Sequence, residues 1–172
     1  MPTTCKLIAK NVLGSNTATV TFSSIPGTFT DLWIVISARS SSGNMPGGSA
    51  DFLFMNLNST NQSSHRYLYG NGSGTGSATS PARGLGYLTD PNCTANTFAS
   101  IEIYVPNYAG TTAKSVSATS VTENNATAAA MAAHAALFSS VTSAVTSVDF
   151  TTEDAANFVS GSSFFLYGIS KA

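Results

Sequence analysis

The chain has 172 residues, of which 7 are Lys or Arg and 8 are Asp or Glu, so only 9% are charged and the formal net charge is -1. An ordinary soluble domain carries about 25% charged residues, so Ser, Thr, Asn and Gly must do much of the solvating here. The Lys and Arg residues do not cluster in the sequence as they would to neutralise nucleic-acid phosphates. This argues against direct nucleic-acid binding. No apolar run approaches the roughly 20 residues that cross a membrane. The composition favours a structural or adhesive protein over acid–base or metal chemistry.

The length suits a single domain whose one hydrophobic core is large enough to be stable without disulfide bonds or a structural metal ion. No internal repeat and no shift of composition marks a linker, so residues 1–172 are predicted to form one domain. The first residues, MPTTCKLIAKNVLGS, lack the apolar core of a secretory signal. We therefore expect a soluble protein that is made in the cytoplasm.

Short apolar runs bounded by Gly, Pro, Asn or Ser recur along the chain, and this punctuation predicts strands. No helical pattern separates them, which favours two packed sheets over a βαβ sheet. The expected fold is all-β, a single antiparallel β-sandwich, jelly-roll-like. The predicted strands are Cys5–Lys10, Thr17–Phe22, Asp31–Arg39, Asp51–Asn58, Arg66–Tyr69, Gly84–Leu88, Thr97–Val105, Lys114–Glu123, Ala129–Phe138, Val145–Phe150 and Ser163–Ile169.

Two of these strands show a clear period of two, which assigns their faces. In strand 31–39 every second residue, beginning with Leu32, is apolar and points to one face. The residues between them start apolar and end polar, and they point to the other face. Strand 97–105 places an aliphatic stripe inward, leaves polar and aromatic residues outward and stops at a proline. The inward sets are Leu32, Ile34, Ile36 and Ala38 in the first strand and Ala99, Ile101, Ile103 and Val105 in the second; Glu102 and Tyr104 point outward.

The segment 126–138, ATAAAMAAHAALF, carries two interpretations. Alanine is the best helix former, so thirteen residues could form a surface helix. The alternation of Met131 and Leu137 with His134 and Phe138 favours a strand instead. Small residues on such a strand would let the second sheet or another subunit approach closely.

Two segments are predicted as long loops, Ser40–Ala50 and Gly70–Pro81, because both are too rich in Gly and Ser to pack by themselves. We expect them to be exposed or ordered by a partner. The alternating glycines of the second loop lack the helix and Lys-Ser/Thr pair of a phosphate loop.

Neither the cysteines nor the histidines form a pattern of ligand or nucleophile residues. Cys5 and Cys93 are too few for a disulfide framework and are expected to be reduced, buried thiols, with a Cys5–Cys93 disulfide as the alternative. His65 and His134 have no third histidine or carboxylate at ligand spacing. We predict no catalytic residue, no metal ligand and no cofactor.

The carboxylates have turn, cap and strand-end contexts that explain most of them. A glycan hydrolase would need two of them about 5–10 Å apart in one cleft, and Glu102 and Glu123 are the pair to test, with no enzymatic effect expected. The full set is Asp31, Asp51, Asp90, Glu102, Glu123, Asp149, Glu153 and Asp154. A second open question is whether the tyrosines form a contact surface or line sandwich edges: Tyr67, Tyr69, Tyr87, Tyr104 and Tyr108.

Four stretches taken together carry a resemblance to a known family: Thr21–Leu32 (TFSSIPGTFTDL), Ala95–Tyr108 (ANTFASIEIYVPNY), Val121–Ala128 (VTENNATA) and Asn157–Ile169 (NFVSGSSFFLYGI). In this order they resemble small jelly-roll-like virion structural proteins of tailed bacteriophages, cyanophages among them. The resemblance covers about Leu7 to Ile169 and transfers no functional residue, because the shared motifs look like fold determinants.

The resemblance implies a virion structural protein and no enzyme. Its leading form is a capsid decoration, or cement, protein: a homotrimer on the capsid exterior that bridges subunits of the major capsid protein. The alternative is a tail- or fibre-associated adhesin or receptor-binding module. Neither form involves direct contact with nucleic acid or membrane, and both imply synthesis in the host bacterial cytoplasm.

Overall fold

The computed structural model describes residues 4–43, 51–72, 74–79, 84–123, 125 and 129–170, and within them it contains strands and no helix. There is accordingly no helix among these residues that is long and apolar enough to span a membrane. The strands are β1 (Cys5–Val12), β2 (Val20–Phe22), β3 (Asp31–Ala38), β4 (Asp51–Leu57), β5 (Ser64–Gly70), β6 (Thr75–Thr79), β7 (Gly84–Leu88), β8 (Ala99–Val105), β9 (Lys114–Glu123), β10 (Ala129–Phe138), β11 (Val148–Thr152) and β12 (Ser163–Ile169).

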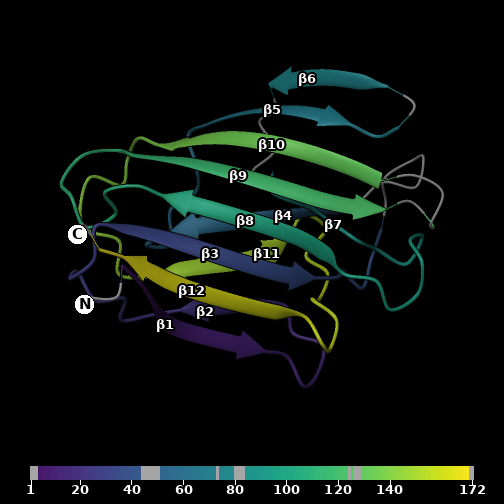
Figure 1. The fold of residues 1–172 in the computed structure, drawn as a ribbon, viewed down its shortest axis with the longest axis horizontal. Coiled ribbons are helices and arrows are strands. Elements are labelled where there is room, and N and C mark those ends of the chain that lie inside the picture. Colours follow the sequence, from purple (N-terminus) through teal and green to yellow (C-terminus); the bar gives the residue numbers. More distant parts are fainter. Residues whose placement is uncertain are drawn as a thin grey trace.

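The strands form two sheets of unequal width that lie one behind the other (Figure 1). The larger sheet has eight strands in the order β1-β12-β3-β8-β9-β10-β5-β6, and the smaller has four in the order β2-β11-β4-β7. Every pairing within the two sheets is antiparallel. The expected antiparallel β-sandwich is therefore confirmed.

One apolar core fills the space between the sheets. Three phenylalanines lie at its centre: the Phe164 ring packs 5.6 Å from Phe150 and 5.0 Å from Phe158, measured between ring centroids. The larger sheet adds aliphatic rows from β3 and β8, including Ile34 and Ile103, which are fully buried and directly paired.

The alternation predicted for two strands is confirmed. In β3 the buried side chains are Leu32, Ile34, Ile36 and Ala38, and in β8 they are Ala99, Ile101, Ile103 and Val105. Glu102 and Tyr104 point outward. The period of two identified the core side of both strands because one face of the larger sheet is buried and the other is open.

Residues Ala129–Phe138 of the alanine-rich segment form strand β10, so the helix interpretation is wrong for them; residues 126–128 lie outside the described residues. Ala132, His134 and Phe138 are buried whereas Met131 and Leu137 are exposed, which is the alternation that the sequence showed. Pairing with β9 on one side and β5 on the other supplies tertiary hydrogen bonds that override the helical propensity of alanine.

The prediction of one long loop over 70–81 is wrong in part, because Thr75–Thr79 forms β6 and pairs with β5. Its glycine and serine content hid the strand, since such residues carry little strand propensity. Gly76 lies opposite Tyr69, and a Cβ atom at this position would fall 2.7 Å from the tyrosine ring. The glycine therefore leaves room for the ring and is compatible with pairing. In the other predicted loop, Ser40 is buried, and residues 44–50 lie outside the described residues.

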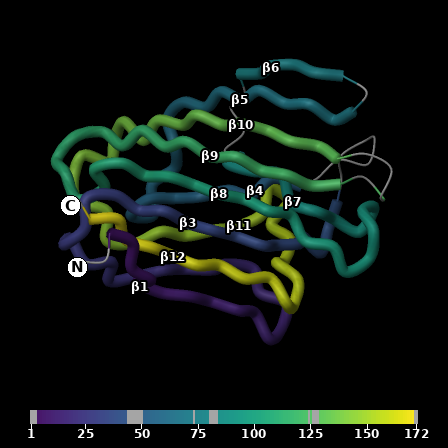
Figure 2. The backbone as a smooth tube through the Cα atoms, in the orientation of Figure 1, coloured from purple at the N-terminus to yellow at the C-terminus, as the bar shows by residue number. Residues whose placement is uncertain are grey.

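The larger sheet extends past the smaller one on the side of β5 and β6 (Figure 2). β7, the edge of the smaller sheet, packs beneath β8, β9 and β10. At the opposite edge, β1 pairs with β12 in the register Cys5 to Ile169, so the first and last strands lie side by side.

Replacing Phe164 by Ala is expected to lower the free energy of unfolding by about 3–5 kcal/mol, because a fully buried ring between two other rings would leave a cavity. The neighbouring Phe165 points to the outer face and is half-buried, so Phe165→Ala is the matched control, with a loss of about 1 kcal/mol. Urea unfolding of the three proteins measures both values. Equal losses would contradict the assignment of the two faces.

Candidate functional site

The outer face of the larger sheet, the face turned away from β2, β4, β7 and β11, gathers the exposed large apolar side chains of the described residues. The strand registers place each of them there. They are Leu7, Val12, Leu68, Tyr104, Val121, Met131 and Leu137, and Leu68 and Met131 keep 64% and 56% of their surface exposed. Outward Ser115, Ser117 and Thr119 of β9 separate them into groups. Exposed apolar groups on one face are typical of a site that another molecule covers.

One half of the outer face is an aromatic row. Leu7, Tyr167, Trp33 and Tyr104 are directly opposite one another across β1, β12, β3 and β8. The Trp33 and Tyr167 rings lie 5.5 Å apart. The Tyr104 hydroxyl donates a 2.7 Å hydrogen bond to Asp31, which fixes the ring at the end of the row.

The other half of the outer face is aliphatic and has small side chains at its centre. Val121 of β9 pairs with Met131 of β10, and Leu68 of β5 pairs with Ala133. Because Ala133 and its neighbour Ala135 project little, the surface is low along β10 and bordered by longer side chains.

Few charges interrupt the outer face; the registers place Lys10, Asp31, Glu102, Glu123 and Arg66 on it. Glu102 stands on β8, and no described residue donates a hydrogen bond to its carboxylate. Arg66 stands on β5 and donates to the Ser64 hydroxyl and the His65 carbonyl, not to a described carboxylate. The outer face of the smaller sheet is different, because Thr21, Asn56 and Asp149 form a polar row there.

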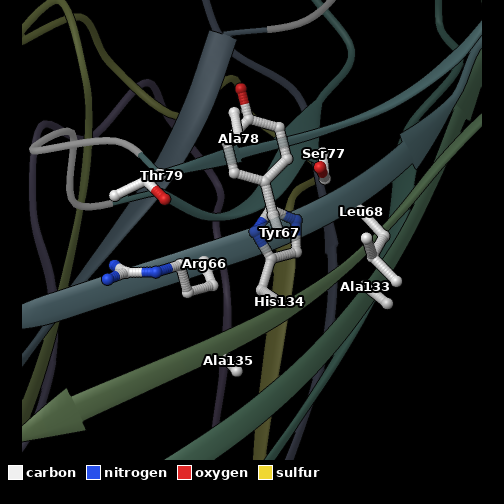
Figure 3. A pocket seen from close by; sticks show the side chains of 9 residues that line it. All are labelled: Arg66, Tyr67, Leu68, Ser77, Ala78, Thr79, Ala133, His134 and Ala135. Atoms are coloured by element: carbon white, nitrogen blue, oxygen red, sulfur yellow. The ribbon is translucent and has the colours of Figure 1, made fainter.

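A hollow of about 360 Å³ opens on the aliphatic half, and Figure 3 shows Arg66 and Leu68 on either side of Tyr67 at its border. Outward positions of β5, β6 and β10 frame it, and the row Ala78, Tyr67 and His134 crosses its floor. The framing residues are Arg66, Leu68, Ser77, Thr79, Ala133 and Ala135. A second, similar hollow lies between β8 and β9 beside Trp33.

Beneath this hollow, on the inner face, five rings attach β5 and β10 to the edge of the smaller sheet. This aromatic–histidine cluster consists of Phe52, His65, Tyr67, Tyr87 and His134. His65 Nε2 and His134 Nδ1 lie 3.1 Å apart, and the two rings are stacked within 12°. Such a contact needs one donor and one acceptor, so it is satisfied when the two facing nitrogens share one proton.

Burial, and after it the charge of His65, lowers the pKa of His134 from 6.5 to about 4. Sequence reasoning missed the histidine pair, because only the register of β5 against β10 brings two residues 69 positions apart into contact. The cluster uses both histidines as buried, hydrogen-bonded ring surfaces. It explains their presence without a ligand or a proton-transfer step.

Arg39 and Glu123 hold the loop between β7 and β8 from two sides. Arg39 donates to the carbonyl oxygens of Thr94, at 2.8 Å, and Thr97, at 3.1 Å. The Glu123 carboxylate accepts from the Thr94 amide and hydroxyl and from the Thr97 hydroxyl. Buried Cys93 donates its thiol to the Glu123 carbonyl at 3.0 Å. These charged groups have a structural role that keeps the loop ordered.

The pair suggested for glycan hydrolysis, Glu102 and Glu123, is not brought together. Glu102 is level with Thr119, so Glu123 lies four residues further along β9, a separation of about 13 Å along the strand. The three donors on Glu123 also occupy its carboxylate.

A different group of carboxylates forms where β4 begins and β11 ends. Burial is the main cause that raises the pKa of Asp51, and the charge of Asp154 adds to it. Burial also raises the pKa of Glu153, followed by the charges of Asp51 and Asp154. Asp51 accepts from the Ser40 hydroxyl at 2.6 Å and from the Glu153 amide. Sequence reasoning had explained these residues as turn and strand-end carboxylates, since it could not supply the β4–β11 register.

The remaining candidates are dispersed. Both cysteines are free thiols, with Cys93 buried and Cys5 only half-buried, so the expectation of two buried thiols holds for Cys93 alone. Tyr108 is fully buried and donates to the Pro26 carbonyl, while Tyr67 and Tyr87 lie in the aromatic–histidine cluster. Among the described tyrosines, Tyr104 is counted with the exposed large apolar side chains of the outer face. The tyrosines therefore do not form a common surface. Within the described part of the chain, no three His, Cys, Asp or Glu residues are grouped to hold a metal ion.

Comparisons with known proteins found no match to this chain among family models, curated proteins or solved structures. The family resemblance therefore stays a prediction from the four sequence stretches.

The low pKa of His134 predicts an acid-dependent loss of stability. Above pH 6.5 the histidine is neutral in both folded and unfolded chains, whereas between pH 6.5 and about 4 the unfolded chain binds the proton more tightly. The stabilisation that is present above pH 6.5 is then lost, by about 3 kcal/mol at pH 4. Denaturant unfolding at several pH values, for the protein and for His134→Gln, measures this contribution as a difference.

The comparison with His134→Gln is needed because Asp51 and Glu153 act in the opposite direction. Their raised pKa values favour folding when they are protonated, and that stabilisation is lost as the pH rises. Parallel stability curves for the protein and the variant would contradict the prediction.

Proposed function

We propose that this protein is a structural subunit of a bacteriophage virion, and specifically a capsid decoration protein that binds the outside of the shell and strengthens contacts between major capsid subunits. The observation that carries this proposal is the outer face, where exposed apolar side chains gather on one side of a rigid sheet with few charges. A surface of this kind is suited to being covered by protein.

The chemistry of the described residues is consistent with binding alone. Three of the carboxylates are engaged in the fold: Asp31 accepts from Tyr104 and Asn107, Glu123 binds the β7–β8 loop, and Asp51 binds Ser40. The proposed mechanism is therefore added binding energy. A protein that binds the assembled shell and not its separated subunits stabilises the shell by mass action, and several contacts per oligomer strengthen this effect.

The low charge bears on how such a protein meets its partner. Charged surfaces steer association and lose affinity as salt is added. A surface of apolar and uncharged polar side chains binds by shape and hydrogen bonds, so its affinity is expected to change little with ionic strength.

The test is sedimentation of the purified protein with phage capsids that lack it. We expect saturable binding at sites spread over the shell, greater resistance of the decorated shells to heat, and an affinity that falls by less than about threefold between low and high salt. A Leu7→Arg variant should bind less well if the outer face contributes, and Thr21→Arg, on the smaller sheet, is the matched control.

Two results would contradict this function. Absence of binding to capsids, with attachment to tails or to host cells, would favour the adhesin instead. Hydrolysis of a glycan that depends on Glu102 or Glu123 would reveal an enzyme.

A further inference from the structure

We propose that the outer face of the larger sheet pairs with the outer face of a second copy of this chain, around a two-fold axis that runs along the strands between β9 and β10. The pairing would give the protein a dimeric form before it meets any other partner. The dimer would cover the strands from β3 to β6 and leave the outward side chains of β1 and β12, including Leu7 and Tyr167, for the shell of the proposed function.

The area of the outer face suits a stable dimer. Strands are spaced about 4.8 Å apart and rise about 3.3 Å per residue, so the six strands from β3 to β6 cover about 650 Å². The accessible surface is larger than this flat projection, because side chains project from it. Specific protein interfaces bury about 600–1,000 Å² on each partner, and the area of this face falls within that range.

The centre of the face allows two sheets to approach. Along β10 the outward positions include Ala133 and Ala135, and longer apolar side chains border them: Leu68, Val121, Met131 and Leu137. Two sheets pack face to face at about 10 Å when their side chains interlock. Under the proposed axis β10 of one copy lies over β9 of the other, so Met131 faces Val121, and the short side chains of Ala133 and Ala135 face Thr119 and Ser117.

The charges are complementary under the same axis. Glu102 lies on β8 and Arg66 on β5, and these strands stand at equal distances, about 7 Å, on opposite sides of the line between β9 and β10. A two-fold rotation about that line places β8 of one copy over β5 of the other. Glu102 is level with Leu68, and Arg66 lies two residues further along β5, about 7 Å, which an extended arginine spans.

The rotation forms this contact twice, which is why the occupant we propose is the chain itself. A two-fold interface requires a surface that is complementary to itself. Here the acid and the base stand on one face, symmetric about the line between β9 and β10, and neither has an ionic partner among the described side chains. The resemblance described above implies a trimer, and the number of subunits in solution separates the two arrangements.

The experiment is sedimentation velocity and light scattering over a range of micromolar concentrations. We expect a monomer–dimer equilibrium. Glu102→Arg and Arg66→Glu should each raise the dissociation constant by about tenfold, because each places like charges opposite one another. The double variant Glu102→Arg/Arg66→Glu should restore the dissociation constant to within about threefold of the original, since the pair is only reversed.

Two further variants complete the test. Met131→Asp should abolish the dimer, because it places a charge in the apolar centre, whereas the control Thr21→Arg on the smaller sheet should leave the dimer unchanged. Circular dichroism and thermal unfolding establish that each variant is folded.

A monomer at all concentrations, a trimer, or a dimer that is indifferent to Met131→Asp would overturn the proposal. Single charge variants that weaken the dimer without rescue by the double variant would overturn the two-fold placement. Capsid binding by a protein that stays monomeric would leave the proposed function intact and reject the pairing, so the two can fail separately.

Discussion

The alternation of side chains across an eight-stranded sheet that has only a four-stranded partner is the constraint on which this structure depends. Inward residues of the central strands reach the smaller sheet and form the main core. The smaller sheet ends at β7, beneath β10, and at β10 and β5 aliphatic residues give way to the rings of the aromatic–histidine cluster, which bridge to this edge through Phe52 and Tyr87. The outward residues of the same strands have no layer of the described residues to pack on, and exposed apolar side chains of this kind are typical of a binding surface.

A protein with so few charges uses those it has mainly to fix its loops. Arg39 and Glu123 supply charge-assisted hydrogen bonds to one loop, and Lys114 donates its buried ammonium to the carbonyl oxygens of Gly110 and Thr112. Burial lowers the pKa of that lysine. Hydrogen bonds to buried charges are stronger than those between neutral groups, so a small number holds loops that Gly, Ser and Thr would leave loose. The surface is consequently left with little charge.

The sequence predicts a strand correctly where one face of the strand is buried and turn residues such as Gly, Pro, Asn or Ser flank it. The bounds of β7, β9, β10 and β12 match the prediction, because alternation and flanking turn residues coincide there. β6 was missed, since its stability comes from pairing with β5 and not from its own side chains. The same limit applies to the sites: the His65–His134 contact and the acidic group around Asp51 are products of strand register, which no local pattern encodes.

The pairing of β1 with β12 has a consequence for how the molecule is made. β12 also lies between β1 and β3, so the strand that joins the N-terminal segment to the rest of the larger sheet is the last one synthesised. Contacts between residues this distant along the chain close slowly, because the loop entropy is lost before they form. On the ribosome, β1 and the edge of β3 that pairs with β12 therefore remain unpaired until about residue 169 has emerged. During that interval Lys6 and Lys10 of β1 limit aggregation with other nascent chains, because charged lysines oppose pairing at an open strand edge.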